Sequence, residues 1–178
     1  MGRGKVYPAA RAGALLNPVR RLVQSPTRTV RSMGLQANWS VLEIGCGPGF
    51  FTPSIAAAVA PGRPVALDLQ AEMLHWVRRR VDVGLVNADA TVLPFATGSF
   101  EAALIATVLG EVPLPGRCLA EVARILKPTG VLCVAETRRD SDFTRLSEVV
   151  ALVEPLGFRL TSRQGPRWQY VARFKRTS

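Results

Sequence analysis

Apolar and polar positions alternate in blocks along most of this chain. From residue 40 onward, apolar runs of strand length are separated by amphipathic segments of helix length. The apolar runs cover 41–44, 65–68, 84–87, 100–107, 131–135, 158–161 and 169–174, and the helical segments cover 50–60, 71–80, 119–126 and 143–156. This alternation predicts an α/β fold, a three-layer αβα sandwich around a mostly parallel seven-stranded sheet. The last two runs flank a turn at Gly165-Pro166, which predicts one antiparallel strand.

The first 40 residues follow a different pattern. Residues 1–12 predict a loose arm, and residues 18–35 predict one or two short amphipathic helices. Ser25-Pro26 is typical of a helix start, and Gly34 is typical of a helix end. We therefore predict two parts: a basic N-terminal arm with helices that cap the site, residues 1–40, and the domain that carries the site, residues 41–178.

Charge follows the same division. The 178 residues include 23 Lys plus Arg and 13 Asp plus Glu, which gives a net charge of +10. Residues 1–40 contain seven of these bases and no acid, and the first acid is Glu43. Three interpretations of this basic segment stay open: a lid over a pocket, a helix on a membrane surface, or an arm that binds RNA.

Several classes of protein are excluded by composition. No apolar run reaches the roughly 18 residues of a transmembrane helix, and the N-terminus does not resemble a secretory signal. Cys46, Cys118 and Cys133 are odd in number and widely spaced, which predicts no disulfide framework and a reducing, cytoplasmic location. With one histidine, His75, and no Cys-x-x-Cys, we expect no metal site.

A glycine-rich turn after the first predicted strand is the strongest chemical signal. Residues 43–51 read Glu-Ile-Gly-Cys-Gly-Pro-Gly-Phe-Phe, a spacing of E-x-G-x-G-x-G between a strand and a helix. Glycines permit close approach of the backbone to a ligand, and the helix start behind them offers free N–H groups. A dinucleotide fingerprint would place a small residue at position 50, where this chain has Phe50.

Further motifs follow in a consistent order. Asp68 ends the second predicted strand, and Asn87-Ala88-Asp89-Ala90 follows the third. Residues 93–101 read Leu-Pro-Phe and then Ser-Phe-Glu, and residues 119–130 end in Arg-Ile-Leu-Lys-Pro-Thr-Gly. Together with the glycine motif, these residues resemble the class I S-adenosylmethionine-dependent methyltransferases. The likeness is to their small-molecule branch, which includes ubiquinone and menaquinone methyltransferases.

This resemblance implies a Rossmann-like fold and S-adenosylmethionine as cofactor, with S-adenosylhomocysteine as product. The glycine loop would lie against the amino-acid end of the cofactor, Asp68 would bind the ribose hydroxyls, and Asp89 would accept from the adenine amino group. Alternatively, Asp68 caps the next helix and Asp89 only forms a turn. The implied cofactor-binding residues are Glu43, Gly45, Cys46, Gly47, Gly49, Asp68, Leu69, Met73, Asp89, Ala90 and Thr107.

Few catalytic side chains are expected, because methyl transfer from a sulfonium depends mainly on positioning and exclusion of water. Glu111, after the fourth predicted strand, is the candidate general base, and Tyr7 on the arm is a candidate pocket residue. Alternatively, Glu111 is an exposed acid at a helix start without a catalytic role.

The motifs that the sequence lacks are the main information about the methyl acceptor. The Pro-Pro-aromatic motif of base-amino methylases is absent at Ala106-Thr107-Val108-Leu109, and no Pro-Cys occurs. We expect a small-molecule acceptor, lipid-like in one version, with peripheral membrane contact. The alternatives are an RNA or protein methyltransferase that uses the basic arm, with nucleic acid the less favoured partner, and a non-catalytic S-adenosylmethionine-binding protein. A nicotinamide oxidoreductase is disfavoured by Phe50 and by the lack of Tyr-x-x-x-Lys.

Overall fold

One seven-stranded sheet organises the chain, in a computed structural model that describes residues 6–138 and 142–177. The strand order is β3-β2-β1-β4-β5-β7-β6, and β7 runs antiparallel to both of its neighbours. The other neighbouring pairs are parallel. The strands are β1 (Ser40–Ile44), β2 (Arg63–Asp68), β3 (Gly84–Asn87), β4 (Phe100–Ala106), β5 (Leu126–Thr137), β6 (Phe158–Gln164) and β7 (Gln169–Arg176). The predicted mixed sheet with one antiparallel strand is confirmed.

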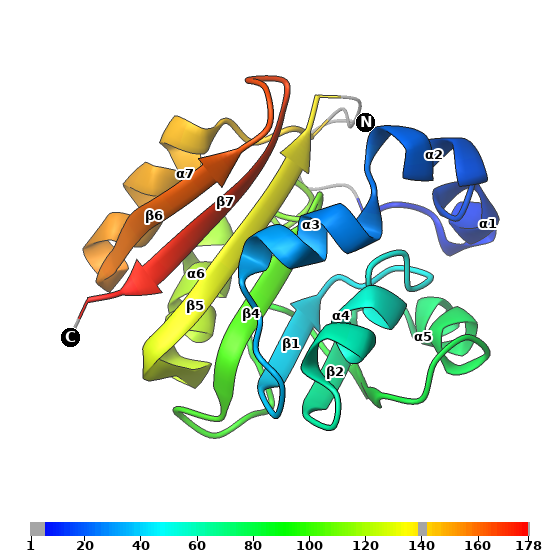
Figure 1. The fold of residues 1–178 in the computed structure, drawn as a ribbon, viewed down its shortest axis with the longest axis horizontal. Coiled ribbons are helices and arrows are strands. Elements are labelled where there is room, and N and C mark those ends of the chain that lie inside the picture. Colours follow the sequence, from blue (N-terminus) through cyan, green and yellow to red (C-terminus); the bar gives the residue numbers. More distant parts are fainter. Residues whose placement is uncertain (1–5, 139–141, 178) are drawn as a thin grey trace.

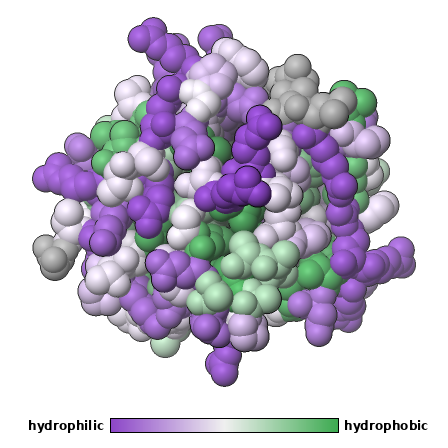
Figure 2. All heavy atoms as spheres, viewed as in Figure 1, coloured by the Kyte–Doolittle hydropathy of each residue, from purple (hydrophilic) through white to green (hydrophobic). Residues whose placement is uncertain are grey.

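Helices cover both faces of this sheet. They are the 3-10 helix η1 (Ala9–Arg11), α1 (Ala12–Leu15), α2 (Pro18–Val23), α3 (Pro26–Met33), α4 (Thr52–Val59), α5 (Ala71–Arg78), α6 (Pro115–Ile125), α7 (Leu146–Val153) and the 3-10 helix η2 (Glu154–Leu156). Figure 1 shows α3 and α4 in front of the sheet and α6 behind β4 and β5. Figure 2 shows the front face, where a pale apolar patch lies among hydrophilic side chains over α4. Ala57 and Ala58 of this helix are exposed.

The N-terminal helices begin and end where the sequence predicts. The hydroxyl of Ser25 accepts a hydrogen bond from the Arg28 N–H at 3.4 Å, and Pro26 occupies the first turn of α3. Gly34 ends this helix with φ +65°, a conformation that favours glycine. α3 falls within the stretch predicted to form amphipathic helices, and its Val30 and Met33 are buried in the core between the front helices and the sheet. Arg3 and Lys5 of the predicted arm lie outside the described residues.

Several boundaries differ from the prediction; for example, the helix expected at 119–126 begins at Pro115, and the strand expected at 158–161 ends at Gln164. Two further differences have a clear physical reason. The strand expected at 131–135 begins at Leu126, directly after α6, because Leu126 pairs with Phe100 and a register shift follows that pair. The helix expected at 143–156 is α7 followed by η2, since Pro155 cannot donate the N–H that an α-helix needs. Gly157, with φ +84°, ends this segment.

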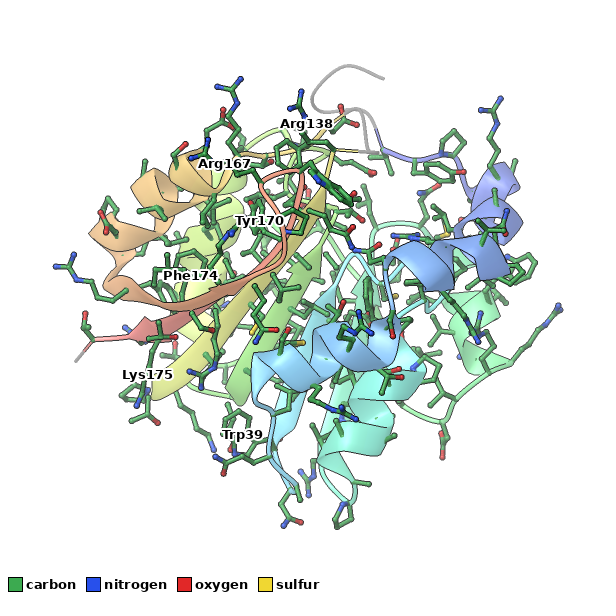
Figure 3. The ribbon with its side chains drawn as sticks, turned by 45° about the horizontal axis from the view of Figure 1, so that its top comes forward. Trp39, Arg138, Arg167, Tyr170, Phe174 and Lys175 are labelled. Carbon is green, nitrogen blue, oxygen red and sulfur yellow. The ribbon has the colours of Figure 1, made fainter. Side chains whose placement is uncertain are left out.

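The parallel strands bring their carboxyl ends to one edge of the sheet. In Figure 3, Arg138 after β5 and Arg167 before β7 lie near this edge, and Trp39 before β1 lies at the opposite edge. The helices α1 and α2 lie at the carboxyl edge (Figure 1). Ligands of open parallel sheets bind at this edge, so the fold places the N-terminal helices beside the expected site. None of the helices in residues 6–138 and 142–177 is long and apolar enough to cross a bilayer.

Candidate active site

A cavity opens at the carboxyl ends of β1, β2 and β4. Its floor is the loop after β1, one side comes from the end of β2 and residues 88–90, and the other side comes from residues 106–113. Residues of the N-terminal segment 6–20, which we call the N-terminal cap, complete the lining. The cap contributes Val6, Tyr7, Leu15 and Arg20.

The glycine loop has a backbone that other residues would not adopt easily. Gly45, Gly47 and Gly49 all have positive φ, at +65°, +53° and +81°. A Cβ on Gly45 would lie 2.4 Å from Cγ2 of Val108, so the loops after β1 and β4 touch through this glycine. Gly45 and Gly47 line the cavity, as expected of cofactor-binding residues. Gly49 is not among the lining residues. A Cβ at this position would lie 3.2 Å from Cγ2 of Val77, so Gly49 allows the glycine loop to pack against α5.

Asp68 ties the end of β2 to the glycine loop. Its Oδ2 accepts a hydrogen bond from the Gly47 N–H at 2.8 Å, and its Oδ1 accepts one from the Gln70 N–H at 2.9 Å. Burial raises the pKa of Asp68, and these backbone N–H groups oppose the shift. A carboxylate has about four lone-pair sites, so two bonds leave room for ribose hydroxyls. The alternative, that Asp68 caps α5, is not seen: Gln70 is the N-cap of this helix, and no side chain caps it.

Glu43 is the second buried acid of the site. It is 3% exposed, and its Oε2 accepts from the Thr52 hydroxyl at 2.6 Å. Burial raises the pKa of Glu43 to about 8, so this carboxyl is mostly protonated at pH 7. Burial also raises the pKa of the neighbouring Cys46 thiol well above its ordinary value, so Cys46 lines the cavity as a neutral group rather than as a nucleophile.

Asp89 lies at the cavity and also forms the expected turn. It lines the cavity together with Ala90. Its Oδ1 also accepts from the N–H and the hydroxyl of Thr91, at 2.7 and 2.8 Å, so the turn interpretation describes a real contact. The hydrogen bonds from Thr91 lower the pKa of Asp89, which keeps this exposed carboxylate charged at neutral pH.

The other expected cofactor residues also reach the cavity. Leu69, Met73 and Thr107 line it, with Leu69 exposed and Met73 buried. Thr107 has φ +56°, an uncommon conformation for a residue with a branched Cβ, and its N–H donates to the Ala135 carbonyl at 2.8 Å. Nothing in the sequence signals this strained backbone, because the position is not a glycine.

The two candidate catalytic residues meet across the cavity. The Tyr7 N–H donates to Oε2 of Glu111 at 3.0 Å, whereas the Tyr7 hydroxyl lies 3.4 Å from the Arg11 carbonyl. Gln70 holds the same stretch: its Nε2 donates to the Tyr7 carbonyl at 2.8 Å, and its Oε1 accepts from the Ala9 N–H at 3.2 Å. Sequence reasoning missed Gln70, whose only signal is its place two residues after Asp68.

These residues fit S-adenosylmethionine. The site offers a glycine backbone for the amino-acid end, remaining lone pairs on Asp68 for the ribose, and apolar contacts from Leu69, Met73 and Ala90 for the adenine. No group of three or more His, Cys, Asp or Glu within the described part of the chain has the arrangement of a metal site.

Comparison with known proteins also supports a site for S-adenosylmethionine. Residues 42–134 match the family model described as a methyltransferase domain. A demethylmenaquinone methyltransferase of Renibacterium salmoninarum is 42% identical over 123 residues, which are 62% of this chain and 52% of that protein. An uncharacterized 37.1 kDa protein from transposon TN4556 of Streptomyces fradiae is 38% identical over 107 residues, 57% of this chain and 31% of that protein. The chain thus spans about half or less of these relatives.

The fold has close structural counterparts. A SAM-dependent methyltransferase from Aquifex aeolicus superposes with a TM-score of 0.88 at 20% identity, over 97% of this chain and all of that one. This likeness bears on the fold, which is the expected Rossmann-like one. The family match covers just over half of the chain and includes the glycine loop, Asp68, Asp89 and Glu111. The chain therefore belongs to the methyltransferase-domain family of class I S-adenosylmethionine-dependent enzymes.

Proposed function

We propose that this protein transfers the methyl group of S-adenosylmethionine to a small, largely apolar acceptor. The observation that carries the proposal is a single cavity with two unlike sides. One side has the glycine loop and the buried Asp68, which suit the cofactor. The other side has apolar residues of the N-terminal cap and of the segment after β4, which include Val6, Leu15, Val108, Val112 and Pro113.

When bound, the cofactor supplies a methyl group on a positively charged sulfur; the acceptor's nucleophile gains the methyl, the S–C electron pair stays on sulfur, and the acceptor loses a proton. The protein's own residues position and exclude water. Phe50, Phe51 and Val108 provide apolar walls close to the glycine loop. Glu111 remains the candidate base, and its bond to the Tyr7 N–H gives it a second task, which is to hold the cap.

The acceptor class is supported by the apolar side of the cavity and by relatives. One of these relatives, from Renibacterium salmoninarum, is named a demethylmenaquinone methyltransferase. A quinol of this type has an aromatic ring that fits between apolar side chains and carries an apolar tail. We place the protein in the cytoplasm, with membrane contact through such a lipid-like acceptor.

The test is a transfer assay with reduced demethylmenaquinone. Purified protein, S-adenosylmethionine and the quinol are incubated, and the product is analysed by mass spectrometry for one added methyl group. We expect a methylated quinol and an equal amount of S-adenosylhomocysteine, with Asp68→Ala as the inactive control. Cofactor binding without transfer to the quinol or to smaller phenols would refute the acceptor class. Absence of cofactor binding would refute the methyltransferase function itself.

A nucleic-acid acceptor is the second candidate, and one observation favours it. Arg78, Arg79 and Arg80 line a shallow depression at the end of α5. Burial and the nearby charge of Arg21 lower the pKa of Arg80, so α2 adds a cation to this surface. Salt-dependent RNA binding together with methylation of that RNA would establish this candidate in place of the quinol. In the buffer of the quinol assay, we expect neither salt-dependent RNA binding nor methylation of RNA.

A further inference from the structure

The helices α2 and α5 present exposed apolar side chains at one end of the molecule. Val19 of α2 is 58% exposed, and Trp76 of α5 is 41% exposed. A Cβ on Gly13 would lie 4.0 Å from Cη2 of Trp76, so α1 packs beside this ring. Figure 1 shows α1, α2 and α5 at the same end of the molecule, away from β6. Single exposed apolar residues are common, so the meaning of these two depends on the charges around them.

Arginines lie on the same two helices. Arg78 and Arg79 are exposed at the end of α5 and line a shallow depression together with Arg80. Burial and the nearby charge of Arg21 of α2 lower the pKa of Arg80, so the two helices bring their cations close together. Like charges that are held together repel one another, and an anionic partner relieves this repulsion.

We call five of these exposed residues the α2–α5 face: Val19, Arg21, Trp76, Arg78 and Arg79. The acids of the surrounding segments do not balance its charge. Together, α2 and residues 71–83 contain five arginines and two acids, Glu72 and Asp82. The face therefore combines apolar side chains with a positive charge.

The α2–α5 face lies next to the cavity. The helix α1 has contacts on both sides, because its Gly13 lies beside Trp76 whereas its Leu15 lines the cavity. Leu69 also lines the cavity, is 53% exposed, and is separated from α5 by Gln70 alone. A surface that contacts this face is therefore also close to the cavity.

We propose that the α2–α5 face binds the surface of an anionic lipid bilayer. A tryptophan and an aliphatic side chain fit the boundary between headgroups and acyl chains, and arginines beside them attract anionic headgroups. Val19 favours this partner over RNA, because an aliphatic side chain has no ring that stacks on a base. The inference rests on the proposed function, because a lipid-like acceptor is held in the membrane and reaches the cavity from there.

The experiment measures binding to vesicles by sedimentation. Vesicles of phosphatidylcholine alone are compared with vesicles of equal parts phosphatidylcholine and phosphatidylglycerol. The control variant Arg159→Gln/Arg163→Gln removes two exposed arginines from β6, at the opposite edge of the sheet from β3, against which α5 packs. We expect the wild type to bind only the anionic vesicles. Arg78→Gln/Arg79→Gln should bind them about 10- to 30-fold more weakly, and the control should change less than about twofold.

Trp76 supplies a second measurement. Brominated acyl chains quench the fluorescence of a tryptophan that enters the bilayer. We expect quenching in the wild type and its loss in Trp76→Phe, which keeps Trp39 and Trp168. Quenching that persists in Trp76→Phe would show that another face contacts the membrane, and would overturn the proposal.

Other results would also overturn it. Equal losses in the two double variants would mean that net charge alone attracts the protein, and equal binding to both kinds of vesicle would contradict the role of the arginines. RNA binding that falls in Arg78→Gln/Arg79→Gln, without vesicle binding by the wild type, would assign the face to nucleic acid. If that double variant does not fold, Val19→Ser decides: we expect a loss of about 3- to 10-fold, and no loss would contradict the proposal.

This inference and the proposed function fail in different ways. Methylation of a quinol dissolved in detergent does not need the α2–α5 face, so Arg78→Gln/Arg79→Gln should keep that activity. Activity in detergent without vesicle binding would overturn this inference alone. Vesicle binding without binding of S-adenosylmethionine would refute the proposed function alone.

Discussion

The two sides of the cavity are held in different ways. On the side of the glycine loop, Glu43 is bonded to Thr52 in a buried position, the buried Asp68 is bonded to the half-buried Gly47, and Gly45 lies against Val108. On the side of the cap, the backbone groups of Tyr7 and Ala9 are bonded to the side chains of Gln70 and Glu111, all in part-buried positions. Segments held by accessible hydrogen bonds open at lower free energy than segments in the core. We therefore expect the cap to open more readily than the cofactor side, which holds the buried Glu43–Thr52 bond.

Among the variants that test the difference between the two sides, Gly45→Ala should lose the most stability. Gly45→Ala combines a strained positive φ with a Cβ 2.4 Å from Val108, so we expect a loss of about 2–5 kcal/mol in the free energy of unfolding. Gly98→Ala is the matched control, since Gly98 has φ +69° and nothing within 4 Å of its Cβ position. It should lose only about 1–2 kcal/mol. Urea denaturation measures both, and equal losses would mean that the contact with Val108 is unimportant.

The next effect compares the two aspartates. Asp68→Asn replaces an oxygen that receives a backbone N–H and removes the charge, so S-adenosylhomocysteine should bind about 10- to 100-fold more weakly. Asp89→Asn should cost less than about tenfold, because Asp89 is exposed and already bonded within its turn. Calorimetric titration distinguishes the two variants. Similar losses would contradict the idea that the buried aspartate dominates binding.

Glu43 should make the free energy of unfolding depend on pH. Its pKa of about 8 in the folded protein lies above its ordinary value of 4.5, so the folded state binds the extra proton between these values. Its contribution therefore lowers stability as pH rises from about 4.5 to about 8, with a slope approaching about 1.4 kcal/mol per pH unit. Glu43→Gln should flatten this decline. Unfolding midpoints from pH 5 to pH 8 test it, and parallel curves for both proteins would disprove it.

The smallest effect on global stability is expected at the cap. Gln70→Ala removes the bonds to Tyr7 and Ala9, and should cost about 1 kcal/mol or less in the free energy of unfolding. Trypsin should nevertheless cut after Arg11 or Arg20 faster than in the wild type, because the cap opens more often. Gln36→Ala, at an exposed position before β1, is the control. Unchanged cleavage rates would show that Gln70 does not hold the cap.

The sequence by itself determined the elements and most of the cofactor side. Strand and helix positions follow from local periodicity, and the glycine loop follows from its residues, since Gly45 and Gly47 adopt the positive φ that glycine permits. Asp68 could be placed because parallel strands end at a common edge. The boundary at Leu126 was missed because a pairing with Phe100 extends β5, and strand pairing is not a local property.

Only the tertiary structure decided how distant residues meet. It turned Gly49 toward Val77, gave Thr107 its strained backbone, and buried Val30 and Met33 of α3 in the core. It also brought Tyr7 to Glu111 and Arg20 to Phe50. These contacts join segments that are far apart in the sequence, and no local sequence pattern predicts such pairs. Local sequence determines which backbone conformations are accessible, whereas the packing of whole elements determines which side chains become neighbours.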